Sequence, residues 1–145
     1  MPPPQNGQSW TCTSWRSEVQ VGTQQEAVVH SWIECFAAQN LDGIVDLYSD
    51  DAAYYVGAWH QPIVGRDAIR AEIAQQFTRV SDDDITILNI FSTDSVVFFE
   101  AVDNFMYGHD DVTLHWASVW EINPLAEIAA QRDYSDPKEL ESRLR

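Results

Sequence analysis

Two stretches of the chain show the hydrophobic spacing of amphipathic helices. After Thr23, apolar side chains recur every three or four residues, and Thr23-Gln-Gln-Glu26 has the pattern of a capping box. This spacing predicts a helix from about Thr23 to Ala38, and Arg66–Val80 shows the same period. The buried face of the first helix is expected to carry Val28, Trp32, Cys35 and Phe36.

The remaining segments indicate one short helix and a series of strands. Asn40 and Gly43 bracket a turn that leads into a short helix over Ile44–Tyr48. Segments rich in β-branched and aromatic residues predict the strands. They are Ala52–Ala58, Ile85–Ser92, Val96–Tyr107, Thr113–Ile122 and Ile128–Tyr134. Helices followed by strands predict an α+β domain, in which a curved mixed or antiparallel sheet wraps around the helices and encloses a cavity.

The polar segments divide the chain into a tail and one domain. Residues 1–22 contain three consecutive prolines and no regular period, so we expect a tail or arm there and a single domain over residues 23–145. The acidic run Asp82–Asp84 is expected to be a solvated turn, and Asp136 is expected to cap a closing helix. At 145 residues and 45% hydrophobic, the chain supports one sizeable core.

Composition then narrows the partners and the compartment. With 8 Lys and Arg against 23 Asp and Glu, the net charge of −15 disfavours nucleic acid and anionic membranes as partners. The sequence has no apolar run of membrane-spanning length and no signal-peptide pattern at its start, so we expect a cytoplasmic protein. Cys12 and Cys35 are expected to be reduced thiols. His109, Asp111 and His115 match no recognised metal-ligand spacing, so we expect neither a metal nor another cofactor.

Two aspartates are predicted to face an apolar cavity from different strands. Alternation along Val96–Tyr107 places Asp103 on one face with apolar and aromatic residues, and Asp133 points the same way if its own face is concave. Burying a carboxylate is costly without partners. The pair therefore either shares a proton for acid–base catalysis or is structural, with one member paired to Arg132 or capping a turn.

Four short motifs, in this order, resemble a known family. They are Tyr55, Gly65-Arg66-Asp67-Ala68-Ile69, Glu100-Ala101-Val102-Asp103 and Arg132-Asp133-Tyr134-Ser135-Asp136. Over roughly residues 24–140 the chain resembles the limonene-1,2-epoxide hydrolases of the nuclear transport factor 2-like, or SnoaL-like, superfamily. The resemblance implies a cone-shaped fold and a homodimer that forms through sheet faces. It also implies that Asp103 deprotonates water, Asp133 protonates the epoxide oxygen and Tyr55 helps to hold the water.

Two supporting residues of that family are replaced here. Its bridging Arg between the carboxylates corresponds to Ala101, and its water-holding Asn corresponds to Gly57. Without the cation, at least one carboxylate should hold its proton more tightly. Without the Asn, an attacking water is less well fixed, which weakens plain hydrolysis relative to attack by a hydroxyl of the substrate.

Aromatic residues and one histidine complete the predicted pocket. In the cone fold that the resemblance implies, Phe105, Trp116 and Trp120 line the cavity, and Trp59 and His60 border its mouth. Each also has a structural alternative, as a core residue or an exposed loop residue. Tyr55 has the alternative of a core tyrosine whose hydroxyl bonds a backbone carbonyl. An aromatic lining predicts a hydrophobic substrate.

Three functions remain open from the sequence. The first is cofactor-independent acid–base opening of a hydrophobic epoxide, by water or by an internal hydroxyl that closes a cyclic ether. The second is isomerisation, dehydration or cyclisation of a natural-product intermediate by the same aspartates. The third is a binding module that lacks catalysis.

Overall fold

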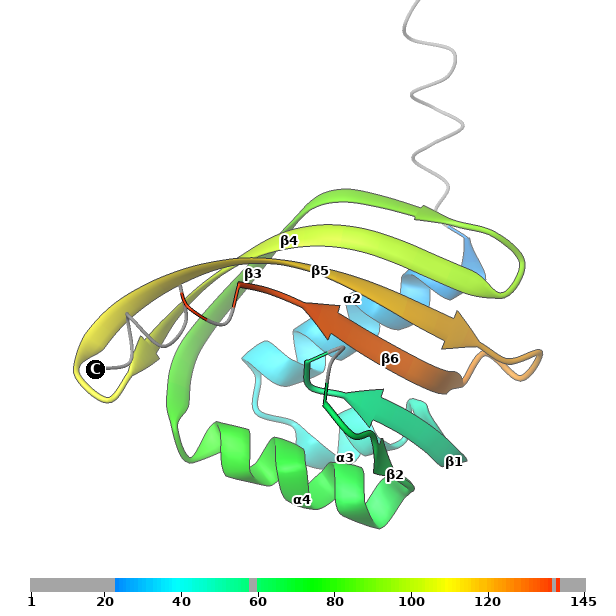
Figure 1. Ribbon diagram of the computed structural model, residues 1–145, viewed down its shortest axis with the longest axis horizontal. Helices are drawn as coiled ribbons and strands as arrows, with labels where there is room; N and C mark the ends of the chain where they lie inside the picture. The colour runs from blue at the N-terminus through cyan, green and yellow to red at the C-terminus, as the bar shows by residue number, and fades with distance from the viewer. Residues whose placement is uncertain (1–22, 58–59, 137, 139–145) are drawn as a thin grey trace, which may run out of the picture.

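In the part of the chain that the structure describes, two helices are followed by two strands, a third helix and four more strands (Figure 1). All six strands belong to one curved sheet. The computed structural model describes residues 23–57, 60–136 and 138. In this part of the chain the helices are α2 (Gln24–Ala37), α3 (Leu41–Val45) and α4 (Arg66–Phe77). The strands are β1 (Tyr48–Tyr55), β2 (Ile63–Val64), β3 (Val80–Ser92), β4 (Val96–Tyr107), β5 (Asp110–Ile122) and β6 (Ile128–Tyr134). The predicted tail over residues 1–22 and most of the predicted closing helix lie outside the described residues.

The sheet has the order β2-β1-β6-β5-β4-β3. Its strands pair antiparallel except β1 and β6, which pair in parallel. Figure 1 shows β3 to β6 arching over the helices, with α2 beneath the concave face and α4 across the open end. This arrangement confirms the predicted α+β class and the mixed, curved sheet. Among the described residues, no helix is long and apolar enough to cross a membrane.

The core forms where α2 packs against the concave face of the sheet. Thr23 caps this helix by accepting a hydrogen bond from the backbone N–H of Glu26, and the Glu26 carboxylate accepts one from Ser92 of β3. Trp32 stacks on Phe36 of α2 with ring centroids 4.8 Å apart and meets Trp120 of β5 edge-on at 5.8 Å. These contacts hold α2 in the concavity, beside the cavity described below.

The second helix begins and ends earlier than its pattern predicts. The Asn40 side chain accepts a hydrogen bond from the backbone N–H of Gly43 at 3.0 Å, so these residues form the cap and first turn of α3 instead of a preceding turn. The chain is already extended at Tyr48, where β1 begins. The third predicted helix ends at Phe77, three residues before Val80.

The acidic run is part of a strand, and the prediction of a solvated turn there is wrong. Between the pairs Ser81–Met106 and Asp84–Asn104, β3 contains one more residue than β4, which defines a β-bulge. Asp82 has a φ of 55°, a left-handed conformation that Asp tolerates better than most residues. The extra residue reverses the alternation of β3, so Asp83 faces the concave side while Asp82 and Asp84 are exposed.

Packing of α4 on the sheet gives a test of the fold. Ile73 has no exposed surface, whereas Leu125, in the loop between β5 and β6, is 79% exposed. We expect Ile73→Ala to lower the free energy of unfolding by about 2–5 kcal/mol, because it removes buried methyl groups and leaves a cavity. Leu125→Ala should change it by less than about 1 kcal/mol. Urea unfolding measures both, and equal losses would contradict this packing.

Candidate active site

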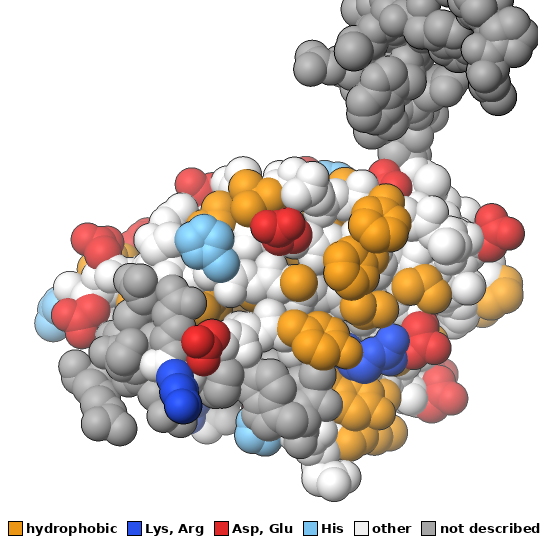
Figure 2. All heavy atoms as spheres, turned by 45° about the horizontal axis from the view of Figure 1, so that its top comes forward, with side chains coloured by type: hydrophobic (Ala, Val, Ile, Leu, Met, Phe, Trp, Pro, Cys, Tyr) orange, Lys and Arg blue, Asp and Glu red, His pale blue; other side chains and the backbone are white. Residues whose placement is uncertain are grey.

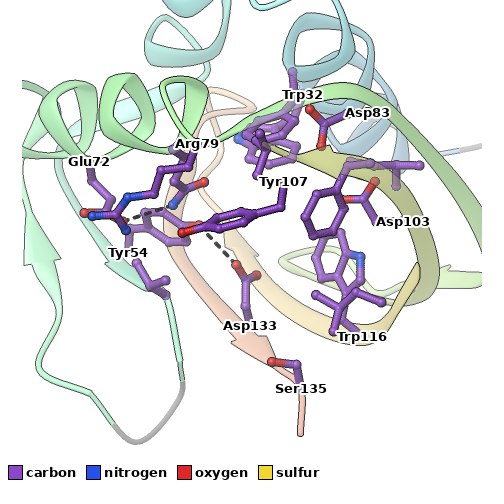
Figure 3. Close-up of a pocket in the computed structure, with 17 residues that line it drawn as sticks. Trp32, Tyr54, Glu72, Arg79, Asp83, Asp103, Tyr107, Trp116, Asp133 and Ser135 are labelled. Carbon is purple, nitrogen blue, oxygen red and sulfur yellow. Dashed lines mark hydrogen bonds between the residues drawn. The ribbon is translucent and has the colours of Figure 1, made fainter. Parts of the chain in front are cut away.

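A cavity of about 270 Å³ lies between the concave face of the sheet and helices α2 and α4. Most of its wall is aromatic or aliphatic, and four carboxylates interrupt that wall (Figure 3). The aromatic residues are Trp32, Phe36, Tyr54, Phe105, Tyr107 and Trp116. The carboxylates belong to Glu72, Asp83, Asp103 and Asp133. An apolar pocket with a few convergent polar groups is the usual form of a small-molecule site.

The structure brings four of the eight residues predicted for the site to the cavity wall, namely Asp103, Asp133, Phe105 and Trp116. Trp120 is fully buried in the core behind it. His60 is exposed and is not part of the wall, and Trp59 lies outside the described residues. The remaining residue, Tyr55, does not line the cavity, whereas its neighbour Tyr54 does.

The tyrosine that reaches the acidic site is Tyr54, and the inward placement of Tyr55 is wrong. Parallel pairing of β1 with β6 sets Tyr54 opposite Gln131 and Tyr55 opposite Arg132. Tyr54 therefore shares the concave face, and its hydroxyl donates a hydrogen bond to Asp133 Oδ2 at 3.2 Å (Figure 3). Tyr48, six residues earlier in β1, is also buried and bonds Gln131, so it has the same parity as Tyr54. Tyr55 is selected by the family resemblance and not by the alternation of the strand.

Hydrogen-bond donors converge on Asp133 from three sides. The Ser118 hydroxyl oxygen lies 2.7 Å from Asp133 Oδ1, and the Gln131 amide nitrogen lies 3.3 Å from the same oxygen. A second layer fixes these donors: the Trp120 indole N–H donates to the Ser118 hydroxyl at 2.7 Å, and the Tyr48 hydroxyl donates to the side-chain oxygen Oε1 of Gln131. Such satisfied buried networks hold side chains in one geometry.

Asp133 is mostly ionised at neutral pH, although its environment raises its pKa. Burial raises its pKa to about 6, while the hydrogen bonds from Ser118, Gln131 and Tyr54 act in the opposite direction. Arg132 does not neutralise it, since the guanidinium donates to Glu121 at 2.6 Å on the outer face. Burial also raises the pKa of Tyr54, which therefore stays protonated as a donor.

Asp103 lacks such support. The residue is 9% exposed, and its Oδ1 is buried without a hydrogen-bond partner among the described residues. Burial raises its pKa to about 7, and the negative charges of Asp83 and Asp84 contribute in the same direction. Near neutral pH, a large fraction of Asp103 is therefore protonated, and its Oδ1 is available to a ligand.

The two aspartates occupy different walls of the cavity. Asp103 of β4 pairs with Leu114 of β5, and Asp133 of β6 pairs with Ser118 of β5. Their backbones therefore lie two strand spacings, about 10 Å, apart across the sheet and four residues, about 13 Å, apart along it. Figure 3 shows both side chains pointing into the same space. The charges that raise the pKa of Asp103 come from β3, and the hydrogen bonds that act on Asp133 come from β1, β5 and β6. Each carboxyl group thus has its own set of neighbours.

The family's bridging Arg position is filled by apolar packing. Ala101 is fully buried and pairs across the sheet with Trp116. The Trp116 ring meets Phe99 edge-on at 5.3 Å. Arg79 is the one Lys or Arg side chain among the described residues that line the cavity, and it lies near Glu72 and Tyr54 (Figure 3).

The sequence analysis does not identify four polar residues of this site, namely Tyr54, Asp83, Ser118 and Gln131. The amide of Gln131 donates a hydrogen bond to Asp133. Gln131 does share the predicted inward face of its strand with Asp133. Ser118 is paired with Asp133 through the β5–β6 register, which no sequence pattern specifies. In the described residues, no three His, Cys, Asp or Glu side chains are grouped to hold a metal ion.

Comparison with known proteins identifies the family of this chain. The model of the SnoaL-like domain family matches residues 29–128, so the chain belongs to that family. This confirms the superfamily expected from the sequence motifs. A comparison with curated protein sequences finds no significant match.

Solved structures with the same fold include enzymes of epoxide chemistry. An LEH-like epoxide hydrolase from Mycobacterium tuberculosis is 20% identical, with a TM-score of 0.72 over 83% of this chain and 89% of that one. The epoxide hydrolase/cyclase-like enzyme SalBIII is 14% identical, with a TM-score of 0.72 over 80% and 93%. A protein of ketosteroid isomerase-like fold from Catenulispora acidiphila is 19% identical, with a TM-score of 0.72 over 80% and 90%.

The adjacent tyrosines provide a test of the Asp133 environment. We expect Tyr54→Phe to raise the pKa of Asp133 above about 6, because the lost hydrogen bond stabilises the carboxylate. Tyr55→Phe is the matched control and should leave that pKa unchanged. Carbon-13 NMR titration of the aspartate carboxyl groups measures it, and equal pKa values in both variants would contradict the assignment.

Proposed function

We propose that this protein is a cofactor-independent acid–base enzyme that opens an epoxide of a hydrophobic small molecule. One observation carries the proposal: two carboxyl groups in different environments face a single apolar cavity. Environments that separate two pKa values define an acid and a base from the same residue type. The epoxide hydrolase and the SalBIII structure among the neighbours support epoxides as the substrate class.

The environments favour Asp133 as the base and Asp103 as the acid, the reverse of the assignment implied by the sequence resemblance. Asp133 has the lower pKa and three donors that stabilise its charge. Asp103 has the higher pKa and an oxygen without a partner. Between the two pKa values, each group is substantially present in the form its role requires.

The reaction then moves one proton at each end of the substrate. Asp133 removes a proton from water or from a hydroxyl of the substrate, and the oxygen attacks an epoxide carbon. As the carbon–oxygen bond of the epoxide breaks, the departing oxygen takes the proton of Asp103. Tyr54, which donates to Asp133, keeps the base oriented toward the nucleophile. The replacements at Ala101 and Gly57 favour a nucleophile supplied by the substrate.

Labelled water separates the candidate functions. Lipophilic epoxides, with and without an internal hydroxyl, are incubated with the protein in heavy-oxygen water, and the products are examined by mass spectrometry. A labelled diol supports hydrolysis, and an unlabelled cyclic ether supports attack by the internal hydroxyl. Bound but unchanged epoxide would overturn the proposal in favour of a binding module. Rearranged product without ring opening would favour an isomerase.

The two aspartates should be separately essential. We expect Asp103→Asn and Asp133→Asn each to lower kcat at least about 100-fold, because each removes one proton transfer. Glu100→Gln, on the exposed side of β4, is the control and should retain activity. Thermal unfolding verifies that each variant is folded. Full activity in either folded aspartate variant would remove that residue from the mechanism.

The pH dependence of kcat/KM should be bell-shaped. Activity should rise as pH increases through about 6, where Asp133 ionises, and fall above about 7, where Asp103 loses its proton. A profile that rises steadily to pH 9 would exclude Asp103 as the acid.

We also propose that the chain forms a homodimer through the outer face of the sheet. Phe91 is 61% exposed and packs on Phe98, with ring centroids 5.2 Å apart, and Leu88 lies on the same face. Figure 2 shows hydrophobic side chains gathered on the side of the molecule that carries these strands. Exposed apolar clusters of this kind mark association surfaces.

Substitution of the outer face tests this association. Phe91→Glu should convert a dimer to a monomer, because it places a charge in the apolar contact. Leu125→Glu, which alters a residue of the β5–β6 loop that is even more exposed, at 79%, should not. Light scattering during gel filtration at about 0.15 M salt gives the mass, and a monomeric parent protein would refute the dimer.

A further inference from the structure

The bulge in β3 selects one member of the acidic run and points it at the site. We infer that Asp83 is a third acidic residue of this site, a positioning residue that acts on the reaction through Asp103. The inference rests on the proposed function, because it concerns the residue assigned as the acid. Three observations carry it: the strand register, the orientation of the side chain and the unsatisfied oxygen of Asp103.

The register makes Asp83 and Asp103 neighbours on the concave face. Ile85 is directly opposite Asp103, and Asp83 is the next inward residue of β3 toward the start of the strand. Inward positions that are diagonal across two strands lie within reach of each other's side chains. Figure 3 shows both carboxylates on the same wall of the cavity, and both line it.

The bulge is what distinguishes Asp83 from its neighbours. In a regular strand that keeps Val80 inward, Asp82 and Asp84 would point inward and Asp83 would point outward. Asp82 instead takes the left-handed conformation and becomes the extra residue. One carboxylate consequently enters the cavity while two remain exposed. Bulges often re-aim a side chain next to an active site.

Electrostatics gives this placement a chemical consequence. Burial raises the pKa of Asp83 to about 6, below the value of about 7 for Asp103, so Asp83 ionises first and its charge opposes ionisation of Asp103. Asp84 adds to this effect from its exposed position. The other titratable or charged side chains that line the cavity are Tyr54, Glu72, Arg79, Tyr107 and Asp133.

For catalysis, the charge of Asp83 helps to keep Asp103, the proposed acid, protonated. Asp103 must hold a proton before each epoxide opens, and a carboxyl group with an ordinary pKa near 4 would be ionised at neutral pH. Burial is the largest cause of the raised pKa of Asp103, and the charge of Asp83, on the same face of the sheet, raises it further. No hydrogen-bond partner among the described residues holds Asp103 Oδ1. The same Oδ1 remains available to the substrate oxygen.

The test compares two neighbouring acids of the bulge. Asp83→Asn removes the inward charge with little change of shape. Asp82→Asn removes an equal charge that is exposed, and Asn also tolerates the left-handed conformation there. Carbon-13 NMR titration of the full-length protein gives the pKa of Asp103, and the pH profile of kcat/KM gives its consequence.

We expect Asp83→Asn to lower the pKa of Asp103 by about 0.5 unit or more and to move the alkaline limb of the profile equally. Relative to its own maximum, activity at pH 8 should fall about threefold or more below that of the parent. Asp82→Asn should leave both unchanged, and Asp83→Glu, which keeps the charge, should restore both.

An unchanged Asp103 pKa in folded Asp83→Asn would overturn the inference. An equal decrease in Asp82→Asn would overturn it too, because the effect would then be one of net charge. The NMR titration needs no substrate, so its result stands even if the protein opens no epoxide. Failure of the proposed function is thereby distinguished from failure of this inference.

Discussion

The cost of ionising a carboxyl group inside an apolar cavity is the constraint on which this site depends. Asp103 and Asp133 both occupy such a cavity, and burial raises the pKa of each above the ordinary range. A raised carboxyl pKa in the folded state means that the stability these groups contribute is lost as pH increases from about 4 through 6 and 7. The same raised pKa values allow both carboxyl groups to gain and lose protons near neutral pH.

The two carboxyl groups differ because their neighbours differ. Asp133 is surrounded by donors that a second layer of buried polar groups holds in place, so the network stabilises its charge. Asp103 faces aromatic rings and a second carboxylate, so its surroundings stabilise the proton. Ala101, which is apolar and pairs with Trp116, supplies no cation that would favour the ionised form of Asp103.

The sequence predicts the regular part of this structure well. The bounds of β4 and β6 match the predicted strands, and period-two alternation correctly places Asp103 and Asp133 on inward faces. β4 pairs with β5 without interruption, and β6 is regular from Ala130 onward, after an irregularity between Ile128 and Ala130, so parity is conserved around both aspartates. The acidic run of β3 is predicted as a turn, and the bulge there decides that Asp83 alone faces inward. Tyr55 is chosen by the family resemblance, whereas Tyr54 is the neighbour that faces the site.

The missed features share one physical cause. A bulge depends on the backbone conformation of one residue, here Asp82, and a cross-strand partner such as Ser118 depends on how two strands slide past each other. Neither has a periodic signature in the chain. The polar groups that tune the site are therefore the part that only the three-dimensional structure reveals.

Titration of the parent protein tests the central claim most directly. With carboxyl carbons labelled and assigned, and no ligand present, we predict that Asp133 titrates near pH 6 and Asp103 near pH 7. If both instead titrate near 4, as exposed aspartates do, the cavity does not separate an acid from a base and the account is wrong.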